Sequence, residues 1–255
     1  MMIEVRMFPC LRDNYGFLAH DADSGETAAI DTPDADEILR QADSAGWTIT
    51  QIWNTHWHPD HAGGNDKLKA ATGALITAPE GEGSKIPAAD RRVSEGDRVA
   101  LGKSEAVVIG TGGHTLGHIA YHLPADGVAF VGDTLFALGC GRLFEGTPAQ
   151  MWDSLSKLRA LPADTTVYCA HEYTQANARF ALSVDPANTA LQDYAAEVDR
   201  KRANDEPTVP TTIGREQAAN PFLRADAADL QAAIGMAGAA PAEVFAEVRQ
   251  RKDNF

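Results

Sequence analysis

Residues 54–65 read N-T-H-W-H-P-D-H-A-G-G-N, so three histidines and an aspartate fall within six positions. Imidazole and carboxylate groups without a thiolate suit zinc, iron or manganese, and they disfavour a closed cysteine site. Pro59 keeps the preceding residue out of helical geometry, so this segment is expected to be a loop followed by a turn. One tetrahedral ion cannot comfortably use all four side chains from so short a segment, whereas two ions can share them. The four candidate ligands are His56, His58, Asp60 and His61.

Further candidate ligands follow later predicted strands, at the point where each strand ends. They are His114, Asp133 and His171. Loops at one edge of a sheet can bring such side chains together, and two four-coordinate ions need about eight contacts between them. A single carboxylate, for which Asp133 is the best candidate, could bridge two ions roughly 3.5–4 Å apart. Water shared by such ions loses a proton near neutral pH and becomes a hydroxide nucleophile.

A sheet and its loops must position these candidates, and the first two-thirds of the chain reads as short strands separated by turns. Helices are predicted over 34–46, around 64–72 and over 151–161. After about residue 173 only helical patterns occur, and no strand is predicted. We therefore expect a mixed α/β domain at 1–172 and a smaller helical domain at 173–255. The predicted strands cover 3–11, 15–21, 27–31, 48–56, 74–78, 104–113, 118–124, 127–133 and 165–172.

Composition and charge restrict the class of partner. The chain of 255 residues is 44% hydrophobic and 23% charged, which is typical of a globular protein. Its formal net charge of −14 disfavours nucleic acid, because phosphate binding needs a basic surface. No run of about 18 apolar residues predicts a membrane span, and charges interrupt the N-terminal stretch too often for a signal peptide. Three separated cysteines without C-x-x-C spacing fit a reducing compartment, so a cytoplasmic location is expected.

Positive charge gathers near the end of this acidic chain, in V-R-Q-R-K at 248–252. One interpretation is a solvated helix end whose cations complement the helix dipole. The other is a binding site for an anion, since an acidic protein that binds one must concentrate its positive charge somewhere. The residues alone favour the first interpretation.

The segment 55–61, T-H-W-H-P-D-H, resembles the signature of the metallo-β-lactamase superfamily. Later segments, together with 249–252 near the end of the chain, are similar to successive motifs of the hydroxyacylglutathione hydrolase, or glyoxalase II, family. The resemblance extends over essentially the whole chain. It implies a four-layer αββα sandwich followed by a helical domain that completes the substrate site. The later segments are G-H-T-L-G-H (113–118), F-V-G-D-T (130–134), C-G-R-L-F-E-G-T (140–147), A-H-E-Y-T (170–174) and N-P-F-L-R (220–224).

The resemblance also implies how the ligands are shared and what the site does. Zinc is expected in both positions, with iron or manganese as alternatives. A bridging hydroxide would attack the thioester of S-D-lactoylglutathione, or of a similar 2-hydroxyacylglutathione, and release glutathione and D-lactate. This is the second step of methylglyoxal detoxification. Asp60 and Asp133 are the predicted catalytic residues, because Asp60 could orient the hydroxide. One ion would be held by His56, His58 and His114, the other by Asp60, His61 and His171, with Asp133 between them.

The resemblance favours the second interpretation of the basic residues at 248–252, a binding site for an anion. Arg249 and Lys252 match the clamp that this family uses for the glycine carboxylate of glutathione, and their spacing places them on one helix face. Arg142 and Tyr173 match further glutathione contacts. Arg142 replaces the lysine of many family members and keeps its charge. Phe144 replaces a tyrosine, so one hydroxyl donor is missing.

Three histidines outside this set are not predicted to be ligands: His118 and His122 are predicted to be structural or to support the ligands, and His20 to be a polar surface residue. The alternatives are a persulfide dioxygenase with one iron, a β-lactamase, and a binding protein that retained only the fold. The helical C-terminal part weighs against the two enzymes, and the seven intact ligand positions weigh against the binding protein. The expected partner is a small-molecule glutathione thioester, without nucleic acid or membrane, and the chain is expected to be a monomer.

Overall fold

The computed structural model describes residues 3–255, which fold as two compact units. Unit 1 comprises residues 3–110 and Thr115–Gly132, and unit 2 comprises Thr111–His114 and Asp133–Phe255. The chain thus enters unit 2 after Gly110, returns to unit 1 within the G-H-T-L-G-H segment, and enters unit 2 again directly after Gly132. A domain boundary between residues 172 and 173 stays a prediction.

Unit 1 contains two sets of strands that pack face to face. The first sheet has the order β1 (Glu4–Cys10), β2 (Asn14–Asp21), β3 (Glu26–Ile30), β4 (Ile49–Trp53), β5 (Leu75–Pro79) and β6 (Arg91–Val93). Its first three strands are antiparallel, and β3 to β6 are parallel. The second set is antiparallel, in the order β10 (Val128–Gly132), β9 (Ile119–Leu123), β8 (Ser104–Gly110) and β7 (Arg98–Leu101).

Aromatic rings fill the space between these two layers of unit 1. The ring of Phe17 on β2 lies 5.8 Å from that of Phe130 on β10, and Trp53 on β4 lies 5.1 Å from Tyr121 on β9. Burying such large apolar rings is the main stabilising contribution available to a sandwich of this kind. The hydroxyl of Tyr121 donates a hydrogen bond to the carbonyl of Asn54, just beyond the end of β4 (2.9 Å).

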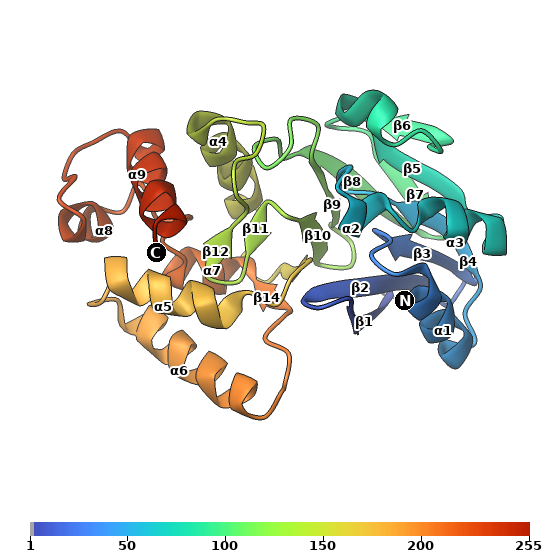
Figure 1. The fold of residues 1–255 in the computed structure, drawn as a ribbon, viewed down its shortest axis with the longest axis horizontal. Helices are drawn as coiled ribbons and strands as arrows, with labels where there is room; N and C mark the ends of the chain where they lie inside the picture. The colour runs from blue at the N-terminus through green and yellow to red at the C-terminus, as the bar shows by residue number, and fades with distance from the viewer. Residues whose placement is uncertain (1–2) are drawn as a thin grey trace. The chain divides into compact units, whose positions relative to one another are not determined.

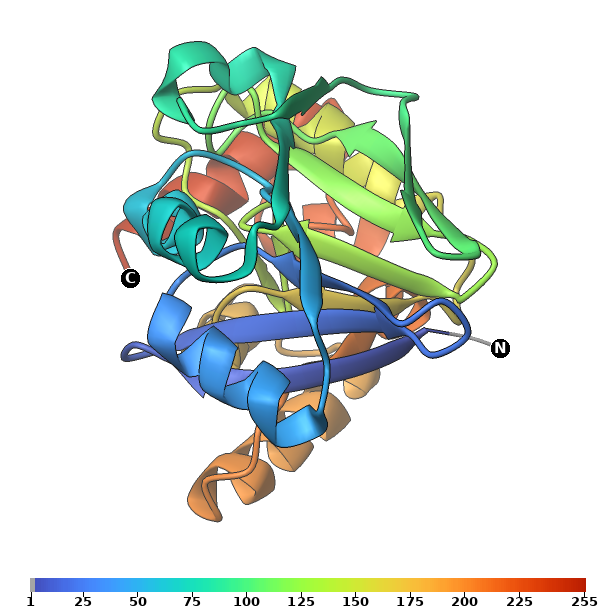
Figure 2. The same cartoon turned by 90° about the vertical axis from the view of Figure 1, so that its right-hand side faces the viewer.

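Two helices cover the outer face of the first sheet: α1 (Ala35–Ala45) and α3 (Asn65–Thr72). In Figure 2, α1 crosses in front of β1 and β2. Asp34 caps α1 by accepting the backbone N–H groups of Asp36 and Glu37, and Gly46 ends the helix with a φ of 70°. The predicted helices at 34–46 and around 64–72 are therefore confirmed. Two short segments complete unit 1, α2 (Pro59–Ala62) and the 3₁₀ helix η1 (Glu80–Lys85).

Unit 2 is mainly helical, with two short strand pairs. Figure 1 shows α5 and α6 running side by side. The helices are α4 (Pro148–Arg159), α5 (Thr174–Val184), α6 (Thr189–Ala203), α7 (Ile213–Ala219), α8 (Ala228–Ala233) and α9 (Pro241–Asp253). The strands pair as β11 (Leu135–Phe136) with β12 (Gly139–Cys140), and as β13 (Thr166–Cys169) with β14 (Thr211–Thr212).

Two sequence expectations fail within unit 2. A strand does occur after residue 173, because β14 pairs with β13, but its two residues are too few to produce a periodic pattern. Helix α4 begins at Pro148 rather than at 151. Thr147 and Gln150 form a capping box there, and Pro148 suits the first helical turn. No helix within residues 3–255 is long and apolar enough to cross a membrane.

Candidate metal centre

The histidine-rich segment lies in unit 1, directly after the parallel strand β4. His58 has extended backbone angles (φ −56°, ψ 149°), as expected before a proline, and Pro59 starts the short helix α2. Asp60 and His61 therefore lie on one turn of helix rather than in a turn after the loop, which corrects the expectation. His56 and His61 are buried, whereas His58 and Asp60 are partly exposed.

The ligand atoms of this segment lie close together. Nε2 of His56 is 3.1 Å from Nδ1 of His58, and Nε2 of His61 is 3.5 Å from Oδ2 of Asp60. The side-chain amide of Asn14, on β2, donates to the same Oδ2 of Asp60 (3.0 Å). That hydrogen bond holds one carboxylate oxygen and fixes the direction of the other.

A buried carboxylate that the sequence reasoning missed orients two of these imidazoles. Oδ2 of Asp31 accepts from Nδ1 of His61 and from the hydroxyl of Thr55, each at 2.8 Å. Because that hydroxyl proton is used, the 3.1 Å contact between Thr55 Oγ1 and Nδ1 of His56 requires His56 to be the donor. Both imidazoles then carry their proton on Nδ1 and leave Nε2 as the acceptor, the form that binds a metal.

Asp31 could have been found from the sequence. It follows β3 just as the recognised candidates follow their strands, and the predicted strand 27–31 ends on it. Its φ of 57° is rare for a residue other than glycine, so the backbone accepts strain there to aim this side chain. Asp31, His56 and His61 lie within one group whose ligand atoms are all less than 4.8 Å apart. Asp31 accepts three hydrogen bonds, from the backbone N–H and hydroxyl of Thr55 and from Nδ1 of His61, which fits an orienting role.

In unit 2, Asp133 lies between two imidazoles. Its Oδ2 is 3.4 Å from Nε2 of His114, and its Oδ1 is 3.4 Å from Nε2 of His171. Nδ1 of His114 donates to the backbone carbonyl of Arg142 (2.9 Å), which again leaves Nε2 as the acceptor. All three side chains are at least nine-tenths buried. Each carboxylate oxygen thus faces a different imidazole, as a bridging carboxylate requires.

The distances between imidazole nitrogens and carboxylate oxygens fit metal ligands better than hydrogen-bonded pairs. Two ligand atoms bound to one tetrahedral zinc ion, each at about 2.0–2.1 Å, are separated by roughly 3.3–3.4 Å. The two contacts of Asp133 are 3.4 Å, and that between Asp60 and His61 is 3.5 Å. A good N–H···O hydrogen bond is shorter, at about 2.9 Å. The donor set, imidazole and carboxylate without thiolate, suits zinc, iron or manganese.

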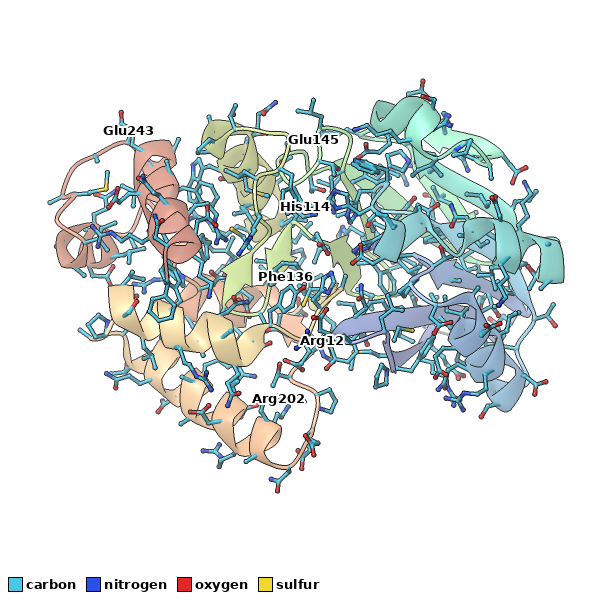
Figure 3. All side chains as sticks on the ribbon, viewed as in Figure 1. Arg12, His114, Phe136, Glu145, Arg202 and Glu243 are labelled. Atoms are coloured by element: carbon cyan, nitrogen blue, oxygen red, sulfur yellow. The ribbon has the colours of Figure 1, made fainter. Side chains whose placement is uncertain are left out.

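Aromatic rings surround the imidazoles of unit 2. Phe144 meets His114 edge to face at 5.2 Å, and the ring of Tyr173 stacks on His171 at 4.7 Å. Phe136 on β11, which is labelled in Figure 3, contacts both His171 and Tyr173. Phe144 and Tyr173 are 63% and 38% exposed, which is unusual for aromatic rings. They provide apolar surface directly beside the candidate ligands.

The basic residues of α9 differ from one another. Arg249 is only 5% exposed: its guanidinium donates to the carbonyl of Cys140 (3.1 Å) and to Oδ1 of Asp253 (2.8 Å). The solvated-helix interpretation is therefore wrong for Arg249. Lys252 is partly buried and donates to the carbonyl of Ala176 (3.2 Å). Burial lowers its pKa, and the positive charges of Arg249 and Arg142 lower it further, as expected where cations gather.

The remaining histidines lie in unit 1, where His118 and His20 have identifiable partners. His118 stacks on His56 with ring centroids 4.8 Å apart, so it supports a candidate ligand. His122 is buried on β9, and burial lowers its pKa. His20 is not simple polar surface as expected, because it stacks on Trp47 (4.5 Å) and contacts the hydroxyl of Thr27 (2.9 Å).

Comparison with known proteins identifies the family. Residues 22–171 match the metallo-β-lactamase superfamily, and residues 172–255 match the family described as hydroxyacylglutathione hydrolase C-terminus. A hydroxyacylglutathione hydrolase of Maricaulis maris is 64% identical over 98% of both chains, and one of Erythrobacter litoralis is 62% identical over the full length of both. Among solved structures, ETHE1 from Myxococcus xanthus has a TM-score of 0.70 at 25% identity, and the match covers 98% of this chain and 90% of that one.

The fold is thus the expected one, a metallo-β-lactamase α/β sandwich followed by a helical C-terminal domain. The superfamily membership and the clusters of histidine and aspartate together support a site for two metal ions. The chain belongs to the hydroxyacylglutathione hydrolase family of the metallo-β-lactamase superfamily.

Proposed function

We propose that this chain hydrolyses the thioester of S-D-lactoylglutathione and of similar 2-hydroxyacylglutathiones, giving glutathione and the free acid. It would thereby perform the second step of methylglyoxal detoxification. The observation that carries the proposal is Asp133, whose two oxygens each lie 3.4 Å from Nε2 of a different histidine. Relatives named hydroxyacylglutathione hydrolase, at 64% and 62% identity over essentially the whole chain, support it.

Seven side chains are the proposed ligands of two divalent ions. Zinc is proposed in both positions, with iron or manganese as alternatives, because the donors are nitrogen and oxygen only. Such ions would supply Lewis acidity towards the thioester carbonyl and would lower the pKa of bound water. The proposed sets are His56, His58 and His114 for one ion, and Asp60, His61 and His171 for the other, with Asp133 shared.

The protein's own groups prepare this centre before any substrate binds. Asp31 and the carbonyl of Arg142 hold protons on Nδ1 of His61 and His114, so that each Nε2 is available. Asn14 fixes one oxygen of Asp60, and the other can accept a proton from the attacking water. The thiol that corresponds to the leaving thiolate has a pKa of about 8.5, so the thiolate departs with little help from a general acid.

Cations and aromatic rings of unit 2 are proposed to bind the glutathione part. Arg142 is exposed and Lys252 partly so, and both are available for glutathione carboxylates. Phe144 and Tyr173 offer apolar surface beside the ligands. Arg249 is proposed to support this site rather than to bind carboxylate, since its guanidinium already bonds Cys140 and Asp253.

The net charge of −14 argues against nucleic acid as a partner. A monomer in the cytoplasm is proposed.

Metal analysis coupled to a hydrolysis assay tests this function. The purified chain should approach two ions per molecule and should release glutathione from S-D-lactoylglutathione. Asp133→Ala should lose ions and at least ~100-fold in rate, as loss of a central electrostatic element commonly costs. A firm value of one ion with full activity contradicts the dinuclear site. Near-normal turnover by Asp133→Ala with two ions retained refutes the bridging role.

A further inference from the structure

The hairpin formed by β11 and β12 connects two parts of the candidate site within unit 2. One strand begins just after Asp133, and the other leads to Arg142, whose carbonyl accepts the proton of His114. The N–H of Gly141 donates to the carbonyl of Thr134 (3.2 Å) at this open end. A Cβ at Gly141 would overlap the carbonyl oxygen of Asp133, so the two strands are as close here as glycine permits. The position of the hairpin therefore sets the positions of Asp133 and of the Arg142 carbonyl.

Two residues per strand are too few to hold such a hairpin in place by strand pairing alone. Its tip carries strain, because Leu138 has a φ of 57°. Three side chains from the helices grip the tip through its backbone. Asn177 of α5 donates to the carbonyl of Ala137 (3.1 Å). Asn220, which follows α7, donates to the carbonyls of Phe136 (3.2 Å) and Gly139 (3.0 Å).

The third side chain, Glu216 of α7, is fully buried and accepts four hydrogen bonds. Its Oε2 accepts from the N–H of Leu138 (2.8 Å) and from the amide of Asn220 (2.9 Å). Its Oε1 accepts from the hydroxyls of Thr211 (2.7 Å) and Tyr194 (3.1 Å). A carboxylate with four donors from separate elements has one defined orientation, and a partly satisfied version of such a network is costly. Glu216 thus joins the hairpin tip to α6, α7 and β14.

We propose that Glu216 is a positioning residue of the metal centre: through the N–H of Leu138 it holds the hairpin that places Asp133 and the carbonyl of Arg142. The inference rests on the proposed function for its catalytic consequence only. Glu216 is not one of the seven proposed ligands, and it reaches the hairpin through the backbone N–H of Leu138. The helical residues of this chain would then set ligand geometry as well as supply substrate contacts.

Glu216→Gln tests the proposal, because the amide keeps the size of the side chain but turns one acceptor oxygen into a donor. If that donor faces Leu138 and Asn220 it meets two donors, and if it faces Thr211 and Tyr194 both hydroxyls must turn round to accept it, so in either orientation the network that fixes the grip on Leu138 should weaken. Protein loaded with cobalt(II) should show an altered visible spectrum. Zinc affinity, measured by competition with a chelator, should fall about 10–100-fold, as for loss of a group that orients a ligand. In the hydrolysis assay kcat should fall while KM changes little.

Glu105→Gln is the matched control. Glu105 lies on β8 and pairs with Arg98 at an exposed position, so the same chemical change there should leave spectrum and affinity unaltered. A folded Glu216→Gln protein with wild-type cobalt spectrum and zinc affinity overturns the proposal. If that variant does not fold, Asn177→Ala, which removes only the bond to Ala137, replaces it under the same criteria. Wild-type protein that binds metal but leaves the thioester intact refutes the proposed function, while the cobalt spectrum still tests the hairpin.

Discussion

At the scale of single residues, hydrogen bonds to Nδ1 of three candidate ligands, His56, His61 and His114, leave Nε2 of each as the acceptor. Asp31 accepts from Nδ1 of His61 directly and orients His56 through the hydroxyl of Thr55. The carbonyl of Arg142 does the same for His114 in unit 2. Imidazoles that are held in one tautomer before binding lose less freedom when an ion arrives. Loss of a group that orients them commonly lowers metal affinity by about 10–100-fold.

The two basic residues of α9 should separate in a kinetic test. Lys252→Ala is expected to raise KM about ten- to a hundredfold with kcat largely unchanged, because a charged contact shared by ground and transition states is lost. Arg249→Ala should instead lower kcat and stability, since a buried guanidinium that holds the carbonyl of Cys140 is removed. Michaelis constants and thermal midpoints of both variants check this. If both variants raise KM equally and leave kcat and the thermal midpoint unchanged, both residues bind carboxylate.

The pH dependence of substrate binding should also follow Lys252. Burial and two neighbouring arginines lower its pKa below the ordinary value of about 10.4. The ammonium form predominates below that lowered pKa, so KM should be lowest there and should rise as pH passes through it. Lys252→Arg keeps the charge at alkaline pH and should remove the rise. A KM profile that is the same for both proteins contradicts this account.

Phe144 gives a test at the rim of the site. It is 63% exposed, its ring contacts His114, and a phenylalanine carries no hydroxyl. Phe144→Tyr should lower KM for S-D-lactoylglutathione by roughly three- to tenfold, the effect of one added hydrogen bond of about 0.5–1.5 kcal/mol. Phe144→Leu is the control that keeps an apolar side chain without a hydroxyl. An unchanged KM in Phe144→Tyr would show that the substrate does not reach this position.

At the scale of elements, close backbone approach explains both glycines of G-H-T-L-G-H. Gly113 has a φ of 149° and packs on Met151 of α4 within unit 2. Gly117, in unit 1, lies against Gly81 of η1, and a Cβ on either would overlap the backbone of the other segment. Thr115 donates to the buried carboxylate of Glu82 beside this crossing. The motif therefore supplies one candidate ligand and two positions where neighbouring atoms pack too closely for a side chain.

Gly117→Ala should accordingly destabilise the protein. The added methyl meets backbone atoms of Gly81 and Glu82, which cannot move as a flexible side chain can, and overpacking of this kind costs about 1–3 kcal/mol. Gly127→Ala is the comparison, since a Cβ there meets no atom and only its φ of 65° is unfavourable. Chemical denaturation of both variants measures the difference. A smaller loss in Gly117→Ala than in Gly127→Ala would contradict the packing argument.

For the whole molecule, the sequence predicted local elements better than contacts between residues that are distant in the chain. Every predicted strand from 3–11 to 165–172 has a counterpart, because alternation and turn residues are local signals. The sequence did not predict the two-residue strand β14 or the helical turn that carries Asp60. Both are too short to show a periodic pattern of apolar residues, and they form because of tertiary contacts. Asp31 was missed because a lone carboxylate has no motif around it. Burial of Arg249 depends on Cys140, 109 positions away, and no local pattern reports such a contact.

The proposed ligands span residues 56 to 171, so bound ions should stabilise the entire fold and not only the loops that hold them. An ion that binds only the folded chain adds about 2.7 kcal/mol per site when its free concentration is a hundred times its Kd. Removing the metal with a chelator should therefore lower the thermal midpoint by several degrees, and adding back zinc should restore it. Asp133→Ala should start from a lower midpoint and respond less to either treatment, because the shared ligand is absent. Glu243→Gln, at an exposed position of α9, should behave like the wild type. If protein shown by analysis to be free of metal unfolds at the same midpoint as loaded protein, the seven residues do not hold ions tightly in the folded state, and the dinuclear assignment falls with them.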